Sequence, residues 1–285
     1  MSEVIEPTKQ KQTLPGLEGL MNPMPKDEDP NYRGSGKLSN KVAIITGADS
    51  GIGKAVAIAF AKEGANIVAS YLSEESDAQS TKQRVEALGG KCVLIAGDIA
   101  SSQHCQAIVD KAMQEFGKID ILVNHAGEQM QTDSIDDVTD EKLERIFKVN
   151  VFSQFYLTRA ALKHLKEGAS IINTTSIVAY EGNPLLLDYS ATKAANVGFT
   201  RALSQALAKK GIRVNAVAPG PIWTPLIPAS FDADKMPEFG KDTPMQRPGQ
   251  PYELAPAYVY LASNIDSSYV SGQVMHVNGG TVVNG

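Results

Sequence analysis

The chain has 285 residues, enough for one large α/β domain or two small ones. Its content of 42% hydrophobic and 21% charged residues is that of an ordinary globular protein with a sizeable buried core. The net charge is −5 with acidic and basic residues interspersed, which argues against nucleic acid or an anionic membrane surface as a partner.

Metal and membrane signals are missing from the sequence. Cys92 and Cys105 lack the spacing of a metal or redox motif, and the histidines are scattered, so we expect no metal site. No apolar stretch approaches the roughly 18 residues of a membrane span, and the first residues lack the apolar core of a signal peptide. We therefore expect a cytoplasmic protein.

Residues 1–36 are polar and rich in proline and show neither helix nor strand periodicity. This composition predicts an extended or partly disordered N-terminal arm. Scattered apolar residues suggest that part of the arm docks on the body or on a neighbouring subunit: Leu14, Leu17, Leu20, Met21 and Met24.

From residue 37 onward, short apolar strands alternate with amphipathic helices. We expect strands at residues 42–46, 66–71, 92–96, 119–123, 170–175, 213–218 and 274–277. The expected helices span residues 54–62, 75–88, 102–116, 139–166 and 253–262, with one more that carries Tyr189 and runs to about residue 210. The pattern predicts a single Rossmann-type α/β domain over residues 37–285, with a doubly wound, mostly parallel seven-stranded sheet and helices on both faces. Prolines concentrate in residues 219–250, which we interpret as a substrate lid without regular structure.

The chemically distinctive residues follow the strands where they end, and in a parallel sheet these ends share one edge. Gly47, Gly51 and Gly53 come between the first strand and the first helix, where a tight glycine turn typically binds a phosphate group. Their spacing is Gly-x-x-x-Gly-x-Gly, not the Gly-x-Gly-x-x-Gly of the usual dinucleotide turn. The position still favours a nucleotide.

Tyr189 and Lys193 are four residues apart on a predicted helix and share one of its faces. A nearby cation favours the phenolate, so we expect Lys193 to lower the pKa of Tyr189 from its ordinary value of about 10. Ser176 ends the preceding strand and is able to donate a hydrogen bond to the same substrate oxygen. Alone, such a pair would be an ordinary helix surface pair, and the other motifs change this interpretation.

Together these motifs resemble the short-chain dehydrogenase/reductase family over about residues 38–280. The Ser-to-Tyr interval of thirteen residues also agrees, whereas His125 departs from the more usual asparagine, with little expected consequence. The arm and lid further resemble a bacterial subgroup of general-stress oxidoreductases, aldehyde reductases or glucose/ribitol-dehydrogenase-like proteins. The resemblance is carried by Thr46, Gly47, Ser50, Gly51, Ile52, Gly53, Asn124, Ala126, Gly127, Asn150, Ser176, Tyr189, Lys193, Pro219, Gly220, Ile222 and Thr224.

The resemblance implies a role for each matching residue. Tyr189 would be the general acid in reduction and the base in oxidation, with Lys193 on the nicotinamide ribose, Ser176 on the substrate oxygen and Asn150 on a water linked to Lys193. Backbone groups around Gly47, Ser50, Ile52 and Gly53 would hold the diphosphate, with Gly51 in the same turn. Asp98 and Ile99 would meet the adenine, and Asn124, Ala126 and Gly127 would line the adenosine side. Ile222 would fix the carboxamide, Thr224 would assist at the phosphate or the carboxamide, and Pro219 and Gly220 would also contact the cofactor. The family also implies a homotetramer or homodimer.

The choice between NAD and NADP depends on the end of the second strand, where an acid favours NAD and a base favours NADP. Ser70 and Tyr71 stand there instead, and we expect no carboxylate to repel a 2′-phosphate while these hydroxyls are able to bind one. The sequence therefore favours NADPH slightly, with use of both cofactors.

The substrate is a small molecule, and the candidate pocket walls are mainly apolar. They suggest an aldehyde or a modest ketone, with a polyol or sugar dehydrogenase as the alternative and a non-catalytic dinucleotide sensor as an alternative of another class. The candidate walls are Ile177, Ala179, Tyr180, Glu181, Pro184, Leu185, Leu186, Leu187, Trp223, Leu226, Phe231, Met236 and Phe239.

Overall fold

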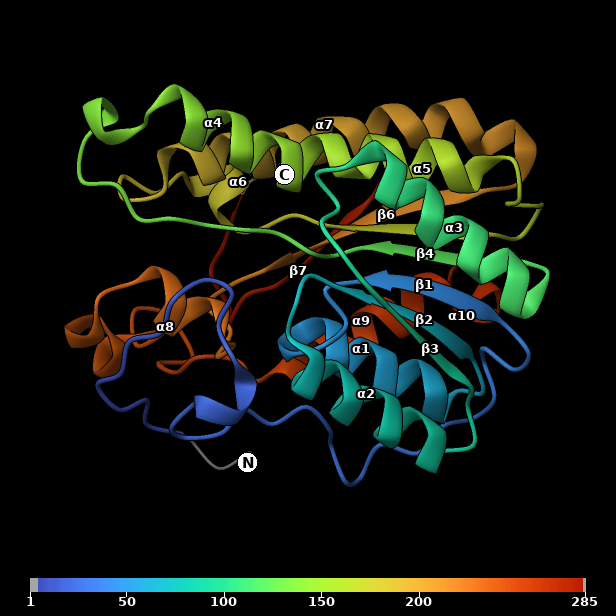
Figure 1. Ribbon diagram of the computed structural model, residues 1–285, viewed down its shortest axis with the longest axis horizontal. Coiled ribbons are helices and arrows are strands. Elements are labelled where there is room, and N and C mark those ends of the chain that lie inside the picture. The colour runs from blue at the N-terminus through green and yellow to red at the C-terminus, as the bar shows by residue number, and fades with distance from the viewer. Residues whose placement is uncertain (1–4, 284–285) are drawn as a thin grey trace.

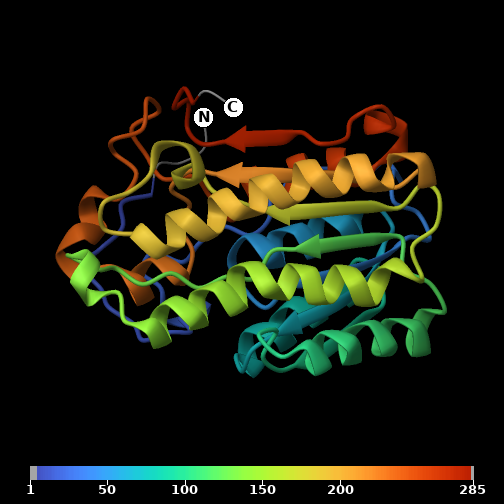
Figure 2. The ribbon, with the colours of Figure 1, turned by 90° about the horizontal axis from the view of Figure 1, so that it is seen from above.

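The computed structural model describes residues 5–283 and is built on one parallel sheet with the strand order β3-β2-β1-β4-β5-β6-β7. The arrows in Figure 2 point to the same side, so the carboxyl ends of the strands share one edge. The chain leaves β1 in both directions along the sheet, which makes the β1–β4 boundary the switch point where such sheets bind ligands. The predicted fold is confirmed. The strands are β1 (Val42–Thr46), β2 (Asn66–Tyr71), β3 (Cys92–Ala96), β4 (Ile121–Asn124), β5 (Ser170–Thr174), β6 (Arg213–Pro219) and β7 (Val274–Val277).

Helices cover both faces of the sheet (Figure 1). One face carries α1 (Gly51–Lys62), α2 (Glu75–Ala87) and α9 (Pro251–Ala262), and the other carries α3 (Ser102–Phe116), α5 (Ser153–Leu162) and α7 (Leu187–Leu207). The shorter helices are α4 (Asp140–Phe147), α6 (Val178–Glu181), α8 (Leu226–Ser230) and α10 (Asn264–Ser267).

Strand β1 shows why the strands read as continuous apolar runs. Ala43 and Ile45 pack into the cluster under α1 and α9, whereas Ile44 packs into the cluster under α3 and α5. Because neighbouring side chains on a strand point to opposite faces, a strand buried on both faces needs apolar residues at every position.

The helical stretch predicted over residues 139–166 is continuous from Asp140 to Leu162 but is not regular throughout. Between α4 and α5 the backbone forms a π-helix over Lys148–Phe152, which the sequence pattern did not indicate. The wider turn carries the buried Asn150, whose side chain bonds to backbone groups outside the helix. Such π-turns arise where a side chain is needed elsewhere than on the regular helix face.

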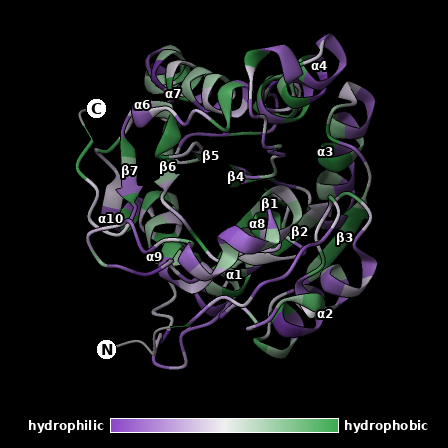
Figure 3. Ribbon diagram, turned by 90° about the vertical axis from the view of Figure 1, so that its left-hand side faces the viewer, coloured by the Kyte–Doolittle hydropathy of each residue, from purple (hydrophilic) through white to green (hydrophobic). Residues whose placement is uncertain are grey.

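The lid is more ordered than the sequence suggested. Residues 219–250 contain α8 and a 3₁₀ helix over Ala233–Glu238. Backbone hydrogen bonds close the base of the lid, from Trp223 N to Gly249 O (2.9 Å) and from Gly249 N to Pro221 O (2.9 Å). The arm runs along the same end of the molecule, as the blue trace in Figure 1 shows, and Figure 3 views this end, with β4, β5 and β6 between the two helix layers.

Within residues 5–283, no helix is long and apolar enough to cross a membrane. In the same range, no group of three or more His, Cys, Asp and Glu side chains is arranged to hold a metal ion.

Candidate active site

A cleft of about 1030 Å³ follows the carboxyl ends of the strands and is covered by the lid and the arm. Of the residues predicted from the sequence, Gly53, Asn124 and Asn150 are buried behind its lining. Those in the lining are Gly47, Ser50, Gly51, Ile52, Ser70, Tyr71, Asp98, Ile99, Ala126, Gly127, Ser176, Tyr189, Lys193, Pro219, Gly220, Ile222 and Thr224.

The glycine turn after β1 requires its glycines. Gly47 and Gly51 adopt left-handed φ angles of 67° and 51°, and a Cβ atom on Gly53 would lie 1.9 Å from the carbonyl oxygen of Gly47. Thr224 of the lid stands against the turn, about 3.0 Å from where a Cβ of Gly51 would be. The turn delivers the chain directly into α1, whose first N–H groups have no partner within the helix.

Ser176, Tyr189 and Lys193 meet at the end of β5, on the far side of the cleft from β2 and β3. Ser176 lies close enough to the Tyr189 hydroxyl to counteract part of the rise in its pKa, and Lys193 Nζ lies 5.3 Å from the centre of the Tyr189 ring. Lys193 Nζ donates to Thr174 O (3.1 Å), and Thr175 Oγ1 donates to Lys193 O (2.7 Å). Both the side chain and the backbone carbonyl of Lys193 therefore tie helix α7 to the end of β5.

The pKa of Tyr189 is shifted opposite to the expectation. Burial raises it to about 12, opposed only in part by the hydrogen bond from Ser176, and burial lowers the pKa of Lys193 to about 8. The expected lowering of the Tyr189 pKa by Lys193 is therefore wrong. The physical reason is that both side chains are buried, which disfavours both charged forms, while the ammonium stands beside the ring.

Asn150 acts on the backbone behind the cleft. Its Oδ1 accepts from Glu128 N (2.8 Å), and its Nδ2 donates to Glu128 O (2.8 Å) and to Thr192 Oγ1 (3.1 Å). A Cβ atom on Gly127 would lie 3.1 Å from Asn150 Oδ1 and 3.4 Å from Lys193 Nζ. The three residues are therefore packed together, and the space at Gly127 is needed for both side chains.

His125 lies in the cleft wall. Its Nδ1 is 3.1 Å from Thr174 Oγ1, which is in turn 2.7 Å from the hydroxyl of the fully buried Tyr258. Burial, helped by the charge of Lys193, lowers the pKa of His125 to about 3. The imidazole is therefore neutral near pH 7 and adds no charge beside Lys193.

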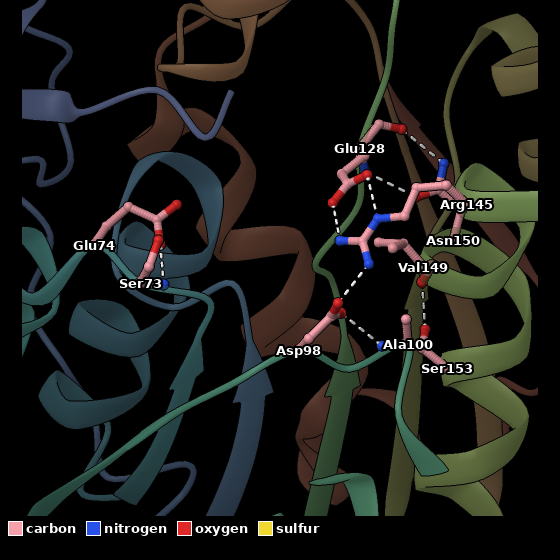
Figure 4. A network of polar contacts seen from close by, with 9 residues as sticks. All are labelled: Ser73, Glu74, Asp98, Ala100, Glu128, Arg145, Val149, Asn150 and Ser153. Atoms are coloured by element: carbon pink, nitrogen blue, oxygen red, sulfur yellow. Dashed lines mark hydrogen bonds and ion pairs between the residues drawn. The ribbon is translucent and has the colours of Figure 1, made fainter. Parts of the chain in front are cut away.

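Arg145 is part of the cleft lining, although no sequence signal pointed to it. Figure 4 shows its guanidinium between the carboxylates of Asp98 and Glu128. It pairs with both, through an Nε–Glu128 Oε2 bond of 3.0 Å and further bonds to each, while Asp98 Oδ1 accepts from Ala100 N (2.9 Å). Burial raises the pKa of Asp98, and the hydrogen bonds from Arg145 and Ala100 outweigh this, so the net shift is downward. Arg145 thus holds Asp98, the predicted adenine contact, as a carboxylate in a fixed orientation.

The end of β2 also corrects an expectation. The Tyr71 hydroxyl bonds to Glu75, and burial raises its pKa to about 12, so this hydroxyl is already engaged. Ser70 is part of the lining, and its buried Oγ has no hydrogen-bond partner within residues 5–283. Asp49 and Glu74 line the same part of the cleft, so the expectation that no carboxylate stands here is wrong. Tertiary packing brings Glu74 back beside the turn, which the position of the strand end could not reveal.

The substrate end is formed in part by the predicted apolar walls. Trp223 is fully buried and packs against Met21 of the arm, so it belongs to the lid's own core. Glu181 and Asn183 add polar groups to this end of the cleft. The predicted walls that line the cleft are Ile177, Glu181, Leu186, Leu226, Phe231, Met236 and Phe239.

The arm contributes to the cleft as well. Leu14, Pro15 and Gly16 are part of its lining, and the carboxylate of Glu18 reaches the glycine turn. The apolar side chains between positions 14 and 24 were the sole sequence signal for this contact. Nothing in the sequence indicated Glu18.

Comparisons with known proteins agree with this geometry. A family model described as enoyl-(acyl carrier protein) reductase matches residues 47–282. A Bacillus subtilis protein described as an uncharacterized oxidoreductase, YhdF, is 59% identical over 94% of this chain and 93% of its own length. An Arabidopsis thaliana protein named NADPH-dependent aldehyde reductase 1, chloroplastic, is 53% identical over 97% of this chain and 98% of its own. A Daucus carota glucose and ribitol dehydrogenase is 50% identical over 98% of each chain.

The fold is also similar to solved structures. A short chain dehydrogenase from Burkholderia cenocepacia J2315 in complex with NADP matches with a TM-score of 0.80 and 32% identity, covering 86% of this chain and 98% of that one. Because sequence and structure match over nearly the whole chain, the protein belongs to the short-chain dehydrogenase/reductase family and is a nicotinamide-dependent oxidoreductase that acts on carbonyl or alcohol groups.

Proposed function

We propose that the protein reduces aldehydes or small ketones with NADPH, with Tyr189 as the general acid in this direction and the general base in the reverse one. The observation that carries the proposal is the meeting of Ser176, Tyr189 and Lys193 at one end of a cleft that has a glycine turn at its other end. A reacting carbonyl and a dinucleotide both fit between these ends.

The residues of the cleft suit a nicotinamide dinucleotide. The glycine turn leaves room for a diphosphate against the N-terminus of α1. Ser70 lines the cleft nearby, and its hydroxyl, which has no partner within residues 5–283, would turn to a ribose or its phosphate. When bound, the cofactor supplies or accepts the hydride. Adenine would lie at Asp98 and Ile99, the adenosine side along Asn124, Ala126 and Gly127, and the carboxamide at Pro219, Gly220, Ile222 and Thr224.

Proton transfer falls to the side chains at β5 and α7. With its pKa near 12, Tyr189 is protonated at neutral pH and ready to give its proton to the substrate oxygen. Ser176 donates a hydrogen bond to that oxygen as negative charge develops on it. Lys193 binds the nicotinamide ribose, which brings its charge to bear on the phenol, and Asn150 orders the backbone that a connecting water would contact.

NADPH is the preferred cofactor in this proposal, and NADH is also used. The name of the Arabidopsis thaliana relative and the NADP in the Burkholderia cenocepacia structure support NADPH. The carboxylates of Asp49 and Glu74 oppose a 2′-phosphate. Burial and the nearby Glu74 raise the pKa of Asp49 to about 7, so part of this opposing charge is removed near neutral pH.

A polyol or sugar dehydrogenase is the second candidate. Glu181 and Asn183 in the cleft lining supply groups able to hold hydroxyls, and the Daucus carota relative is named a glucose and ribitol dehydrogenase. A spectrophotometric screen of aldehydes, ketones, glucose and ribitol with both cofactors separates the two candidates. Turnover of aldehydes supports the reductase, turnover of glucose and ribitol alone supports the second candidate, and tight nucleotide binding without turnover across the panel indicates a sensor instead.

A homotetramer or homodimer is the proposed assembly. Phe152, the last residue of the π-helix, and Phe155 on α5 are 42% and 48% exposed, and Phe155 packs on Phe199 of α7 with ring centres 4.1 Å apart. An exposed aromatic patch on two adjacent helices favours burial against a second copy. Light scattering of the purified protein measures the assembly directly.

A further inference from the structure

The N-terminal arm inserts a carboxylate at the glycine turn. Glu18 is 2% exposed, and its Oε2 accepts a hydrogen bond from Gly51 N (3.0 Å), 33 residues away in the sequence. Its own backbone N–H donates to Asp77 Oδ2 on α2 (2.8 Å). Gly51 is the first residue of α1, whose leading N–H groups have no intrahelical partner and favour negative charge. Glu18 therefore satisfies one of these groups from outside the domain.

A lysine on α1 balances this carboxylate. Lys54 Nζ pairs with Glu18 and lies 2.9 Å from Asp27 Oδ2. Burial lowers the pKa of Lys54, but Asp27 and Glu18 together raise it more, so the amine stays charged. Burial raises the pKa of Asp27 to about 7, with Glu18 adding to this shift. The cation prevents the buried carboxylate from presenting an unbalanced negative charge to a diphosphate.

The arm is held on the lid as firmly as on the turn. Gln12 N donates to Pro228 O (2.9 Å), and Trp223 Nε1 donates to Pro23 O (2.8 Å). Gly16 passes so close to the lid that a Cβ atom there would lie 2.4 Å from Pro225 O. The arm thus bridges the lid and the glycine turn, and Glu18 makes its contact with the turn.

We infer that Glu18 is a positioning residue for the cofactor: it holds the first turn of α1 in the shape that receives the diphosphate. This inference rests on the proposed function, because it takes the glycine turn as the diphosphate site. A turn that is ordered before binding loses less conformational freedom when the cofactor arrives, which appears as affinity. The effect is on cofactor binding, since Glu18 contacts the glycine turn and Lys54 and, within residues 5–283, makes no hydrogen bond or ion pair with Ser176, Tyr189 or Lys193.

The first test compares Glu18→Ala with Glu18→Gln in the full-length protein. The alanine variant loses both contacts, and we expect its KM and its dissociation constant for NADPH to rise about tenfold, with most of the loss in KM and not in kcat. The glutamine variant keeps an acceptor for Gly51 N and should recover part of the affinity. Glu28→Gln is the control, because Glu28 anchors the arm through Arg84 and Lys62, away from the turn. It should lower the melting temperature with little change in KM.

A second pair of variants tests the bridge without removing a charge. Gly16→Ala places a methyl group against Pro225 O and should raise the KM for NADPH, whereas Gly19→Ala meets no atom within 4 Å and should leave it unchanged. Thermal unfolding of each variant separates a loss of folding from a loss of positioning.

The outcomes are distinct. If the folded Glu18→Ala protein binds NADPH as tightly as the parent, or more tightly, the positioning role is wrong, and tighter binding would mean that the carboxylate repels the diphosphate. If the unaltered protein binds neither NADPH nor NADH, the proposed function itself fails. If the KM for NADPH rises as much in Glu28→Gln as in Glu18→Ala, Glu18 only helps to anchor the arm, and the inference is wrong.

Discussion

The two sides of the cleft are built in different ways. The catalytic side stands on β5 and α7, where Ser176, Tyr189 and Lys193 lie within eighteen residues of one another and are tied to neighbouring backbone groups. The covering side joins the arm to residues 219–250, and its buried core is the small cluster of Met21, Trp223, Ile227 and Met236.

Because the two sides are packed differently, we expect them to differ in local stability. The strands under the catalytic side are enclosed by two large apolar clusters, whereas the cover depends on a few buried side chains and on isolated backbone hydrogen bonds. Segments with few buried contacts open at a lower free energy than the core. We therefore expect the side with Ser176, Tyr189 and Lys193 to be the more rigid of the two and the cover to open at a lower free energy.

Replacing the proposed proton donor is the strongest way to separate the two sides. Tyr189→Phe removes the transferable proton, and we expect turnover to fall by about 10³-fold. Because the phenol hydroxyl is at the catalytic end, the dissociation constant for NADPH measured by fluorescence should change little. A fully active variant would remove Tyr189 from its assigned role.

Truncating the core of the cover should loosen it without unfolding the sheet. Met21 is 4% exposed, and Met21→Ala should cost about 2–3 kcal/mol within the cover. Hydrogen exchange of residues 219–250 should accelerate, while exchange in β1 and β4 stays slow. The matched control is Leu20→Ala, because Leu20 is 67% exposed. Equal exchange in both variants would contradict a cover with its own core.

We expect acid to lower the free energy of unfolding through His125. Its pKa is about 3 in the folded chain and about 6.5 ordinarily, so below pH 6.5 the unfolded state gains a proton that the folded state does not. The free energy of unfolding therefore falls as the pH drops through this window, by up to about 1.4 kcal/mol per pH unit. Between pH 6.5 and pH 5, urea unfolding should show a loss about 2 kcal/mol larger than in His125→Asn. Equal losses would mean that His125 is solvated.

The smallest expected effect concerns the cofactor end. Glu74→Gln removes a carboxylate from the lining near Ser70 and should raise the ratio of kcat/KM for NADPH over NADH about threefold to tenfold. Glu86→Gln, farther along α2, provides the control, because Glu86 pairs with Lys82 on the surface. An unchanged ratio for Glu74→Gln would show that this carboxylate does not face the 2′ position.

Much of the catalytic side could be predicted because its signals are local. Strands buried on both faces read as apolar runs, and β1, β2, β3 and β7 have the predicted bounds. The glycine turn and Ser176 follow strand ends, so the topology of a parallel sheet brings them to one edge. Arg145 had no such signal, because its partners Asp98 and Glu128 are 47 and 17 residues away.

The sequence alone determined the sheet, the glycine turn and the order of the residues at the proposed catalytic end, since these depend on periodicity and on residues close in the chain. Tertiary structure decided the direction of the Tyr189 pKa shift, because burial is a property of packing and here outweighs the nearby lysine. It also decided where the arm lies: Pro23 and Trp223 are 200 residues apart, and only the folded chain brings them together. Glu18 owes its place at the glycine turn to the same long-range packing.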